Sequence, residues 1–160
     1  MAKIIVDIAG IEVSRNPSDI LVTYALGSCL GVALYDPVAR VGGLGHFMLP
    51  ESNVENGSTT MNPLKYVNSG VPILYKTMYK YGARKENIQN AIIGGSKIMY
   101  DNGFFDIGRK NYAALRKIFW KNNILINKKH VGGNVNRTVQ LEVATGEVTV
   151  RLSTGEKIRL

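Results

Sequence analysis

The sequence has few of the residues that build covalent or metal-bound structure. Cys29 is the single cysteine among 160 residues, so no disulfide can form within the chain. Only two histidines, His46 and His130, accompany it, and a structural zinc site made of Cys and His is therefore not expected. An unpaired cysteine of this kind is typical of proteins in reducing compartments, which predicts a cytoplasmic location.

Long apolar runs and internal repeats are also missing. No window reaches the roughly 18 consecutive apolar residues of a membrane-spanning helix, and Met1 is not followed by the apolar core of a signal peptide. We therefore expect neither membrane insertion nor export. With 45% hydrophobic residues and no low-complexity tract, residues 1–160 are predicted to form one domain with its own core.

Positive charge is concentrated in the middle of the chain, where twelve Lys or Arg residues between Lys76 and Lys129 face three acidic residues. The remaining residues carry eight basic and nine acidic side chains. This basic segment suits an acidic partner, which could be a nucleic acid, a membrane surface or an acidic protein helix. The alternative is a solvated helix face that keeps the protein soluble. No aromatic-interleaved motif supports nucleic-acid binding, so we expect no nucleic-acid partner.

The hydrophobic pattern predicts strands at both ends of the chain and two helices in the middle. Helices are expected over 68–81, with Pro72 in the first turn and Gly82 after the last, and over 109–122. Strands are expected over 4–6, 20–22, 30–35, 41–49, 91–93, 125–130, 139–143 and 148–152, and a loop over 51–62. This order predicts an α+β fold with layered mixed sheets and two main helices.

A possible catalytic pair emerges from these predictions. Cys29 follows Gly27 and Ser28 where one predicted strand ends and the next begins, which places its sulfur on a tight turn. His46 lies in the strand expected to return beside the one that Cys29 begins. A nearby imidazolium lowers a thiol pKa from about 8.5 to roughly 3.5–7.5 and makes the sulfur a nucleophile, so we expect a thiolate here.

Neighbouring residues extend this hypothesis without deciding it. The hydroxyl of Thr23 or of Tyr24 could hold the distal ring nitrogen of His46 in the useful tautomer. A small buried cysteine and a core histidine explain the same residues without catalysis.

Two glycine-rich segments are candidate binding loops. The segment 94–97 lacks the spacing of a phosphate-binding loop, which argues against nucleotide binding. The segment 132–138 is expected to form a turn, and its Arg137 is a candidate for orienting a polar group of a substrate.

An ordered set of short motifs resembles the CheD family of chemoreceptor glutamine deamidases over most of the chain. The motifs are Leu26-Gly27-Ser28-Cys29, Gly45-His46-Phe47-Met48-Leu49-Pro50, Lys65-Tyr66, Gly94-Gly95, Ile107-Gly108-Arg109-Lys110-Asn111 and Gly132-Gly133 with Arg137. The chain departs from the family pattern at Ser96, where many relatives have alanine, and at Gly70 with Pro72 near the first helix.

The resemblance implies a layered α/β/β fold similar to that of deamidating toxin-like cysteine hydrolases. It implies that Cys29 is the nucleophile, His46 the base and Thr23 its positioning partner, with Gly27 and Ser28 as candidates for the oxyanion site. The reaction would convert chemoreceptor glutamines to glutamate through a thioester, releasing ammonia, with neither metal nor cofactor. The implied partners are the cytoplasmic helices of chemoreceptors and a CheC-type phosphatase. A regulatory association with that phosphatase is the alternative to catalysis as the main role.

Overall fold

The computed structural model describes residues 2–51, 62–97 and 106–160, which form two five-stranded sheets packed face to face. The first sheet has the order β1 (Ala2–Ile5), β3 (Asp19–Leu26), β8 (Arg137–Glu142), β9 (Val148–Leu152) and β10 (Lys157–Arg159). The second sheet has the order β2 (Gly10–Ser14), β5 (Val41–Phe47), β4 (Leu30–Asp36), β6 (Gln89–Gly94) and β7 (Lys128–Val131). Both sheets are mixed, because β1 pairs with β3 and β6 pairs with β7 in parallel, while the other pairs are antiparallel.

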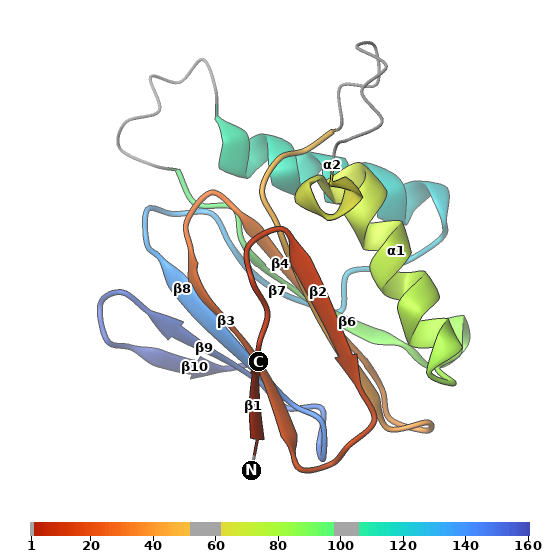
Figure 1. The fold of residues 1–160 in the computed structure, drawn as a ribbon. Helices are drawn as coiled ribbons and strands as arrows, with labels where there is room; N and C mark the ends of the chain where they lie inside the picture. The colour runs from red at the N-terminus through yellow and green to blue at the C-terminus, as the bar shows by residue number, and fades with distance from the viewer. Residues whose placement is uncertain (1, 52–61, 98–105) are drawn as a thin grey trace.

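The helices α1 (Val67–Lys80) and α2 (Ile107–Lys121) cover the outer face of the second sheet (Figure 1). Short 3-10 helices, η2 (Pro63–Lys65) and η3 (Lys85–Asn87), flank α1. The layers are therefore helix, sheet and sheet, and the predicted α+β class with an α/β/β arrangement is confirmed. Within the described ranges, no helix is both long and apolar enough to cross a membrane.

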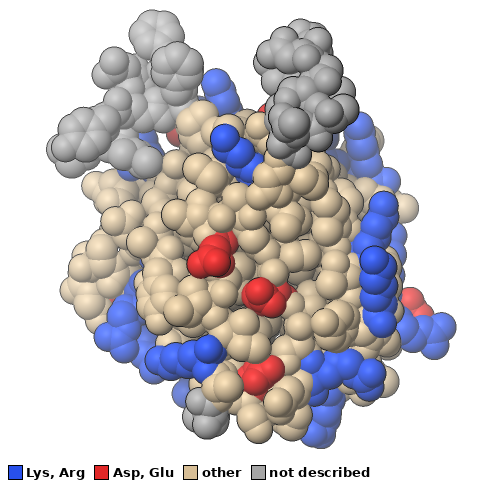
Figure 2. Space-filling view, in the orientation of Figure 1, with Lys and Arg blue, Asp and Glu red and all other residues tan. Residues whose placement is uncertain are grey.

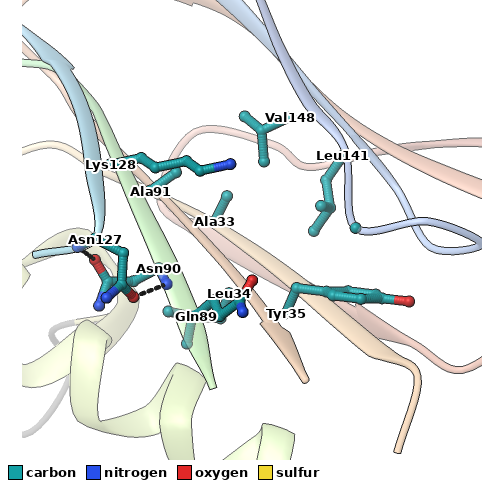
Figure 3. A pocket seen from close by; sticks show the side chains of 11 residues that line it. Ala33, Leu34, Tyr35, Gln89, Asn90, Ala91, Asn127, Lys128, Leu141 and Val148 are labelled. Atoms are coloured by element: carbon teal, nitrogen blue, oxygen red, sulfur yellow. Dashed lines mark hydrogen bonds between the residues drawn. The ribbon is translucent and has the colours of Figure 1, made fainter. Parts of the chain in front are cut away.

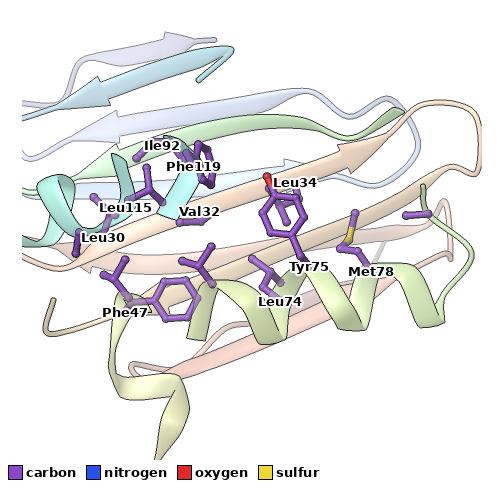
Figure 4. Packing of buried hydrophobic residues seen from close by; sticks show 14 of the residues in the cluster. Leu30, Val32, Leu34, Phe47, Leu74, Tyr75, Met78, Ile92, Leu115 and Phe119 are labelled. Atoms are coloured by element: carbon purple, nitrogen blue, oxygen red, sulfur yellow. The ribbon is translucent and has the colours of Figure 1, made fainter. Parts of the chain in front are cut away.

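One hydrophobic layer lies between the helices and the second sheet (Figure 4). Its aromatic centre is Phe47 of β5, whose ring occupies the space above Gly45 and Gly70, so that a Cβ at either glycine would collide with it. On α2, Phe119 meets Tyr75 of α1 edge to face, with ring centroids 6.1 Å apart. This layer attaches both helices to the sheet that carries the predicted catalytic pair.

A second hydrophobic layer lies between the two sheets and is made mainly of aliphatic side chains. Leu21 of β3 and Leu141 of β8 face Leu44 of β5 and Ile93 of β6 across it. Strand alternation places His46 on the same face of β5 as Leu44, and hence toward the first sheet. The imidazole therefore lies within the intersheet layer rather than beneath the helices.

The structure corrects three details of the sequence-based prediction. Helix α1 begins at Val67, whose N–H donates to the Leu49 carbonyl (2.8 Å), so Pro72 lies inside the helix rather than in its first turn. Burial of Val67, Val71 and Leu74 keeps the helix intact around this proline. Strands β2 and β10 were not predicted, and the strand expected over 125–130 is β7, which begins only at residue 128. The loop predicted over 51–62 lies mostly outside the described residues.

Candidate active site

Cys29 stands on the turn that joins β3 to β4, as predicted, and we call Gly27–Cys29 the nucleophile turn after the role expected of Cys29. All three carbonyls of this turn accept hydrogen bonds from neighbouring elements. The donors are the Ser96 N–H to Gly27 (2.9 Å), the Asn111 Nδ2 to Ser28 (2.9 Å) and the Gly95 N–H to Cys29 (2.9 Å). No described residue accepts a hydrogen bond from the N–H of Gly27 or Ser28. The turn is thus anchored through its carbonyls and keeps unused donors beside the thiol.

Two backbone features shape this end of the sheets. The pairing of β3 with β8 shifts register between Thr23 and Leu26, and Ala25 in this bulge has φ of 55°, a conformation that L residues rarely adopt. Gly94 has φ of 111°, and a Cβ there would collide with the Cys29 carbonyl oxygen. The sequence therefore needs glycine at 94 so that β6 can approach the nucleophile turn closely.

The register of β4 and β5 brings His46 near Cys29. Gly31 pairs with His46 and Leu30 with Phe47, so Cys29 and His46 are diagonal neighbours on one face of the antiparallel pair. Diagonal neighbours are typically about 7–8 Å apart between Cα atoms, within reach of long or aromatic side chains. Cys29 also packs against the intersheet layer, the same layer that contains the imidazole. The predicted neighbourhood of the two strands is confirmed.

Thr23 of β3 reaches across from the first sheet and holds the imidazole. Its Oγ1 lies 2.7 Å from His46 Nδ1 and donates to the Val6 carbonyl at 2.8 Å. Because the hydroxyl proton is used on Val6, the network assigns the proton between Thr23 and His46 to Nδ1. His46 is then the neutral Nδ1–H tautomer with a free lone pair on Nε2. The hydroxyl of Tyr24, the alternative partner for His46, makes no such contact, and this residue is 49% exposed.

The Nε2 atom of His46 is buried and has no hydrogen-bond partner among the described residues. An unpaired buried polar atom destabilises a protein by about 1–3 kcal/mol, and such atoms are otherwise rare. Here the unpaired atom is the ring nitrogen opposite the one that Thr23 holds. A ring nitrogen with a free lone pair is what a base requires.

Burial opposes the thiolate that the sequence led us to expect. It lowers the pKa of His46 from 6.5 to about 4. It also raises the pKa of the Cys29 thiol above its ordinary value, although the residue's own backbone N–H acts in the opposite direction. The expectation of a sulfur ionised by a neighbouring imidazolium at neutral pH is therefore wrong for the resting site. Its resting form is a neutral thiol beside a neutral imidazole.

Asn111 of α2 also belongs to the site, although the sequence indicated no role for it beyond its place in a family motif. Its side chain is fully buried, and Nδ2 donates to the Ser28 carbonyl (2.9 Å) and the Met48 carbonyl (3.0 Å). One amide therefore ties the nucleophile turn to the end of the strand that carries His46. The signal was available in the sequence, since Asn111 precedes Leu115 by four residues on the apolar face of this helix.

Arg137, proposed as a substrate-orienting residue, is 3% exposed and engaged within the protein. Its guanidinium donates to His130 Nδ1 (2.8 Å), Ser96 Oγ (2.8 Å), the Gly94 carbonyl (3.1 Å) and the Gly132 carbonyl (2.7 Å). These bonds join the 132–133 turn to the end of β6, beside the segment that anchors Cys29. The geometry favours a role in positioning the anchor rather than direct contact with a substrate.

A hollow of about 350 Å³, lined by residues of both sheets, lies away from these residues (Figure 3). Its β4 contributors begin at Ala33, four residues beyond Cys29, and Gln89, Asn127 and Lys128 also line it. Neither Cys29 nor His46 lines it. The candidate site is instead a shallow, half-buried turn at one end of the intersheet layer, a form suited to a side chain presented by another protein.

A turn-borne thiol, a buried histidine with a free nitrogen and a hydroxyl behind it are typical of cysteine-dependent hydrolases. A family model described as CheD chemotactic sensory transduction matches residues 48–152. The chain is 48% identical over 155 residues to the probable chemoreceptor glutamine deamidase CheD 1 of Syntrophus aciditrophicus, covering 97% of each. It is 41% identical to the corresponding probable deamidase of Solibacter usitatus, covering 92% of this chain and 88% of that one.

The chain belongs to the CheD family, as its motifs predicted. Among solved structures, the Neisseria meningitidis protein NMB0706 aligns over 78% of this chain and 52% of that one, with 12% identity and a TM-score of 0.43. This likeness is too low to carry an argument about fold or function.

Proposed function

We propose that this protein is a glutamine deamidase that converts glutamine side chains of chemoreceptors to glutamate. Family membership supports the reaction and the substrate class, because the relatives at 48% and 41% identity are named as chemoreceptor glutamine deamidases. The observation that carries the chemistry is the 2.7 Å contact between Thr23 and His46, with the opposite ring nitrogen buried and unpaired.

In the first half of the reaction, His46 acts as a general base on a neutral thiol. Its Nε2 takes the proton of Cys29 Sγ as the sulfur attacks the carboxamide carbon of the substrate. The resulting imidazolium is stabilised by Thr23 Oγ1, which accepts a hydrogen bond from Nδ1–H. The tetrahedral intermediate then collapses, its C–N bond breaks, and the Nε2 proton passes to the departing ammonia. The product of this half is a thioester on Cys29.

In the second half, the same imidazole activates water. Nε2 removes a proton from a water molecule as its oxygen attacks the thioester carbon. When the C–S bond breaks, the thiolate recovers the proton from Nε2, and the substrate leaves as glutamate. The cycle consumes one water and releases one ammonia, so atoms and protons balance. It needs neither a metal nor an organic cofactor.

The nucleophile turn supplies the donors that this scheme requires for the oxyanion. Its carbonyls are occupied by bonds to other elements, whereas the N–H groups of Gly27 and Ser28 have no described acceptor. Preorganised donors of this kind commonly contribute about 10²–10³-fold to the rate of acyl transfer. We assign the oxyanion site to these groups and the N–H of Cys29.

The test is mass spectrometry of a purified chemoreceptor cytoplasmic fragment incubated with the native protein or with Cys29→Ala. Native protein should convert specific glutamines to glutamate, each with one unit increase in mass, and Cys29→Ala should leave them unchanged. Cys29→Ser is the matched control for the volume of the side chain. Conversion by Cys29→Ala would refute the assignment of the nucleophile, and no conversion by native protein would refute the proposed reaction.

Association with a CheC-type phosphatase stays a prediction. The Cys29→Ala protein separates the two roles, because this change removes one sulfur and leaves the backbone anchors of the turn in place. If association is a role of its own, this variant should bind the phosphatase with unchanged affinity.

A further inference from the structure

Large apolar side chains at the C-terminal end of α2 and in the segment that follows it are covered by nothing in the described structure. Trp120 and Leu125 are each 82% exposed, the highest values among the large hydrophobic residues described. They border a groove of about 680 Å³ between α2 and the segment that leads into β7, with Phe119, Ile124 and Ile126 along its floor. Exposed apolar groups gathered around a groove are typical of a protein interaction site.

The charged residues of this groove are all basic. Arg116, Lys117 and Lys129 line it, and no acidic residue does. The Arg116 guanidinium carbon lies 5.8 Å from the centre of the Tyr112 ring and Lys129 Nζ 5.9 Å from it, so both cations are held over one aromatic ring. Figure 2 shows Lys and Arg gathered along the side of the molecule where α1 and the C-terminal end of α2 lie. A partner that fits must bring carboxylates together with an apolar anchor.

The groove lies next to a second hollow, and that hollow reaches a residue that anchors the nucleophile turn. Tyr112 lines both this groove and a second hollow of about 270 Å³, which Lys97 and Arg109 also line. That second hollow reaches Gly95, whose N–H donates to the Cys29 carbonyl. Along α2, Asn111 and Trp120 are nine residues apart, a rise of roughly 13 Å. A partner seated on Trp120 would therefore extend over at least two helical turns before it reached the nucleophile turn.

We propose that this basic groove is a docking site for an acidic amphipathic segment of the protein substrate, separate from the segment that presents the glutamine. The inference rests on the proposed function, since it takes the chemoreceptor as the partner. An apolar side chain of the substrate lies against Trp120, and its carboxylates face Arg116, Lys117 and Lys129. The groove thereby holds a large substrate while Cys29 acts on a glutamine in another segment of that substrate.

Trp120 is the only tryptophan of the chain, so its fluorescence reports on this groove alone. The probe is a tryptophan-free cytoplasmic fragment of a chemoreceptor from the same genome, titrated into the Cys29→Ala protein so that no turnover occurs. We expect the emission of Trp120 to shift to shorter wavelength and to become protected from acrylamide. Affinity should also weaken as salt is raised from about 0.05 to 0.5 M. Binding without any change in Trp120 emission would overturn the proposal.

The double variant Arg116→Glu with Lys117→Glu tests the charges in an otherwise native enzyme. We expect KM for the receptor fragment to rise about tenfold or more, with little change in kcat or in activity on a short glutamine peptide. The matched control is Arg151→Glu with Lys157→Glu, an exposed pair on β9 and β10 that changes the net charge equally. Equal rises in KM for the two double variants would refute specific binding of the substrate in the groove.

Two further outcomes separate this inference from the proposed function. If native protein deamidates the fragment without a change in Trp120 emission, the proposed function stands and the docking site is refuted. If Trp120 emission changes but no glutamine is deamidated, the docking site stands and the proposed function is refuted. A response to vesicles of anionic phospholipid or to duplex DNA at physiological salt, in place of the receptor fragment, would overturn the assignment to a protein partner.

Discussion

The two hydrophobic layers of the molecule differ in what they contain. The layer beneath the helices is built from large side chains such as Phe47, Leu115 and Phe119, which attach α1 and α2 to the second sheet. The layer between the sheets is mainly aliphatic, yet it holds Thr23 and His46, both almost completely buried, at the end next to the nucleophile turn. The helix layer contains neither Cys29 nor His46, whereas the layer between the sheets holds the unpaired ring nitrogen of His46 at its edge.

This difference explains how the proposed reactive centre can be small and largely buried without a deep pocket. Burial between two sheets keeps His46 neutral, and a single hydroxyl from the opposite sheet sets its tautomer. The energetic penalty of an unpaired buried nitrogen is offset by the apolar packing elsewhere. Substitutions in the helix layer should therefore lower mainly stability, and substitutions of His46 or Thr23 should lower mainly activity.

The largest effect is expected from His46→Gln. The glutamine amide can still donate to Thr23, but it cannot take the proton of Cys29, so kcat/KM for deamidation should fall by up to about 10⁴-fold. The unfolding midpoint at pH 7.5 should change little, because the replaced ring is uncharged there. Steady-state kinetics together with urea unfolding check this, and a variant with normal turnover would contradict the base assignment.

The second effect is on stability alone. Phe47→Ala empties the space between Gly45 and Gly70 in the helix layer and should lower the free energy of unfolding by about 3–5 kcal/mol. Activity for each folded molecule should remain within a few-fold of native at low temperature. Denaturant titration and active-site counting by alkylation measure the two quantities separately. A proportionate loss of kcat in fully folded protein would show that the two layers are not separable.

A third effect follows from the pKa of His46, which is about 4 in the folded protein and 6.5 without burial. Between these pH values the unfolded chain binds more protons at His46 than the folded chain does. The contribution of the neutral, buried His46 to stability is therefore complete above about pH 6.5 and is lost as the pH falls toward 4. The loss amounts to roughly 3 kcal/mol. Urea unfolding at pH 7.5 and 4.5 measures it, with His46→Gln as the control that lacks the titrating group. Equal pH dependence in both proteins would contradict the pKa shift.

Thr23→Val should have a smaller effect on activity, about 10–100-fold in kcat. Valine has nearly the same shape but no hydroxyl, so the Val6 carbonyl and His46 Nδ1 lose their shared partner and the tautomer is no longer held. Thr23→Ser restores the hydroxyl and should recover most of the rate. If Thr23→Ser were as impaired as Thr23→Val, packing rather than hydrogen bonding would be the role of this residue.

The smallest effect, about tenfold in kcat, is expected from Asn111→Ala, which releases the nucleophile turn from the end of β5. Asn90→Ala is the matched control. Asn90 is also buried and bridges backbone segments through Leu125 and Asn127, but it lies at the far end of β6. Both variants should lose similar stability in urea, and only Asn111→Ala should slow deamidation. Equal rates for the two would limit Asn111 to a structural role.

Much of the fold could be predicted because local patterns decide it. The strands beside Cys29 and His46 are apolar runs separated by a turn, and their antiparallel pairing follows from a short connection. The start of α1 could not be predicted, since it depends on the tertiary bond from Val67 to Leu49. The short strand β10 is likewise defined by its pairing with β9 rather than by its own three residues.

The candidate site likewise has features that the sequence predicted and features that it did not. The resemblance to a known family placed Cys29, His46 and Thr23, but no pattern along the chain shows that β3 lies opposite β5 in another sheet. The carbonyl anchors supplied by Gly95, Ser96 and Asn111 depend on packing between segments far apart in sequence. The neutral thiol was missed because burial, which a sequence does not display, outweighs the expected effect of the imidazole.

Nitrogen NMR of labelled native protein would test most directly the state of the ring between the sheets. The chemical shifts of the two imidazole nitrogens of His46 report both the site of the proton and its titration. We expect a neutral ring protonated at Nδ1 throughout pH 5.5–8, with charging only near pH 4. A ring that is positively charged at pH 7, or neutral with its proton on Nε2, would contradict the account of a Thr23-held base.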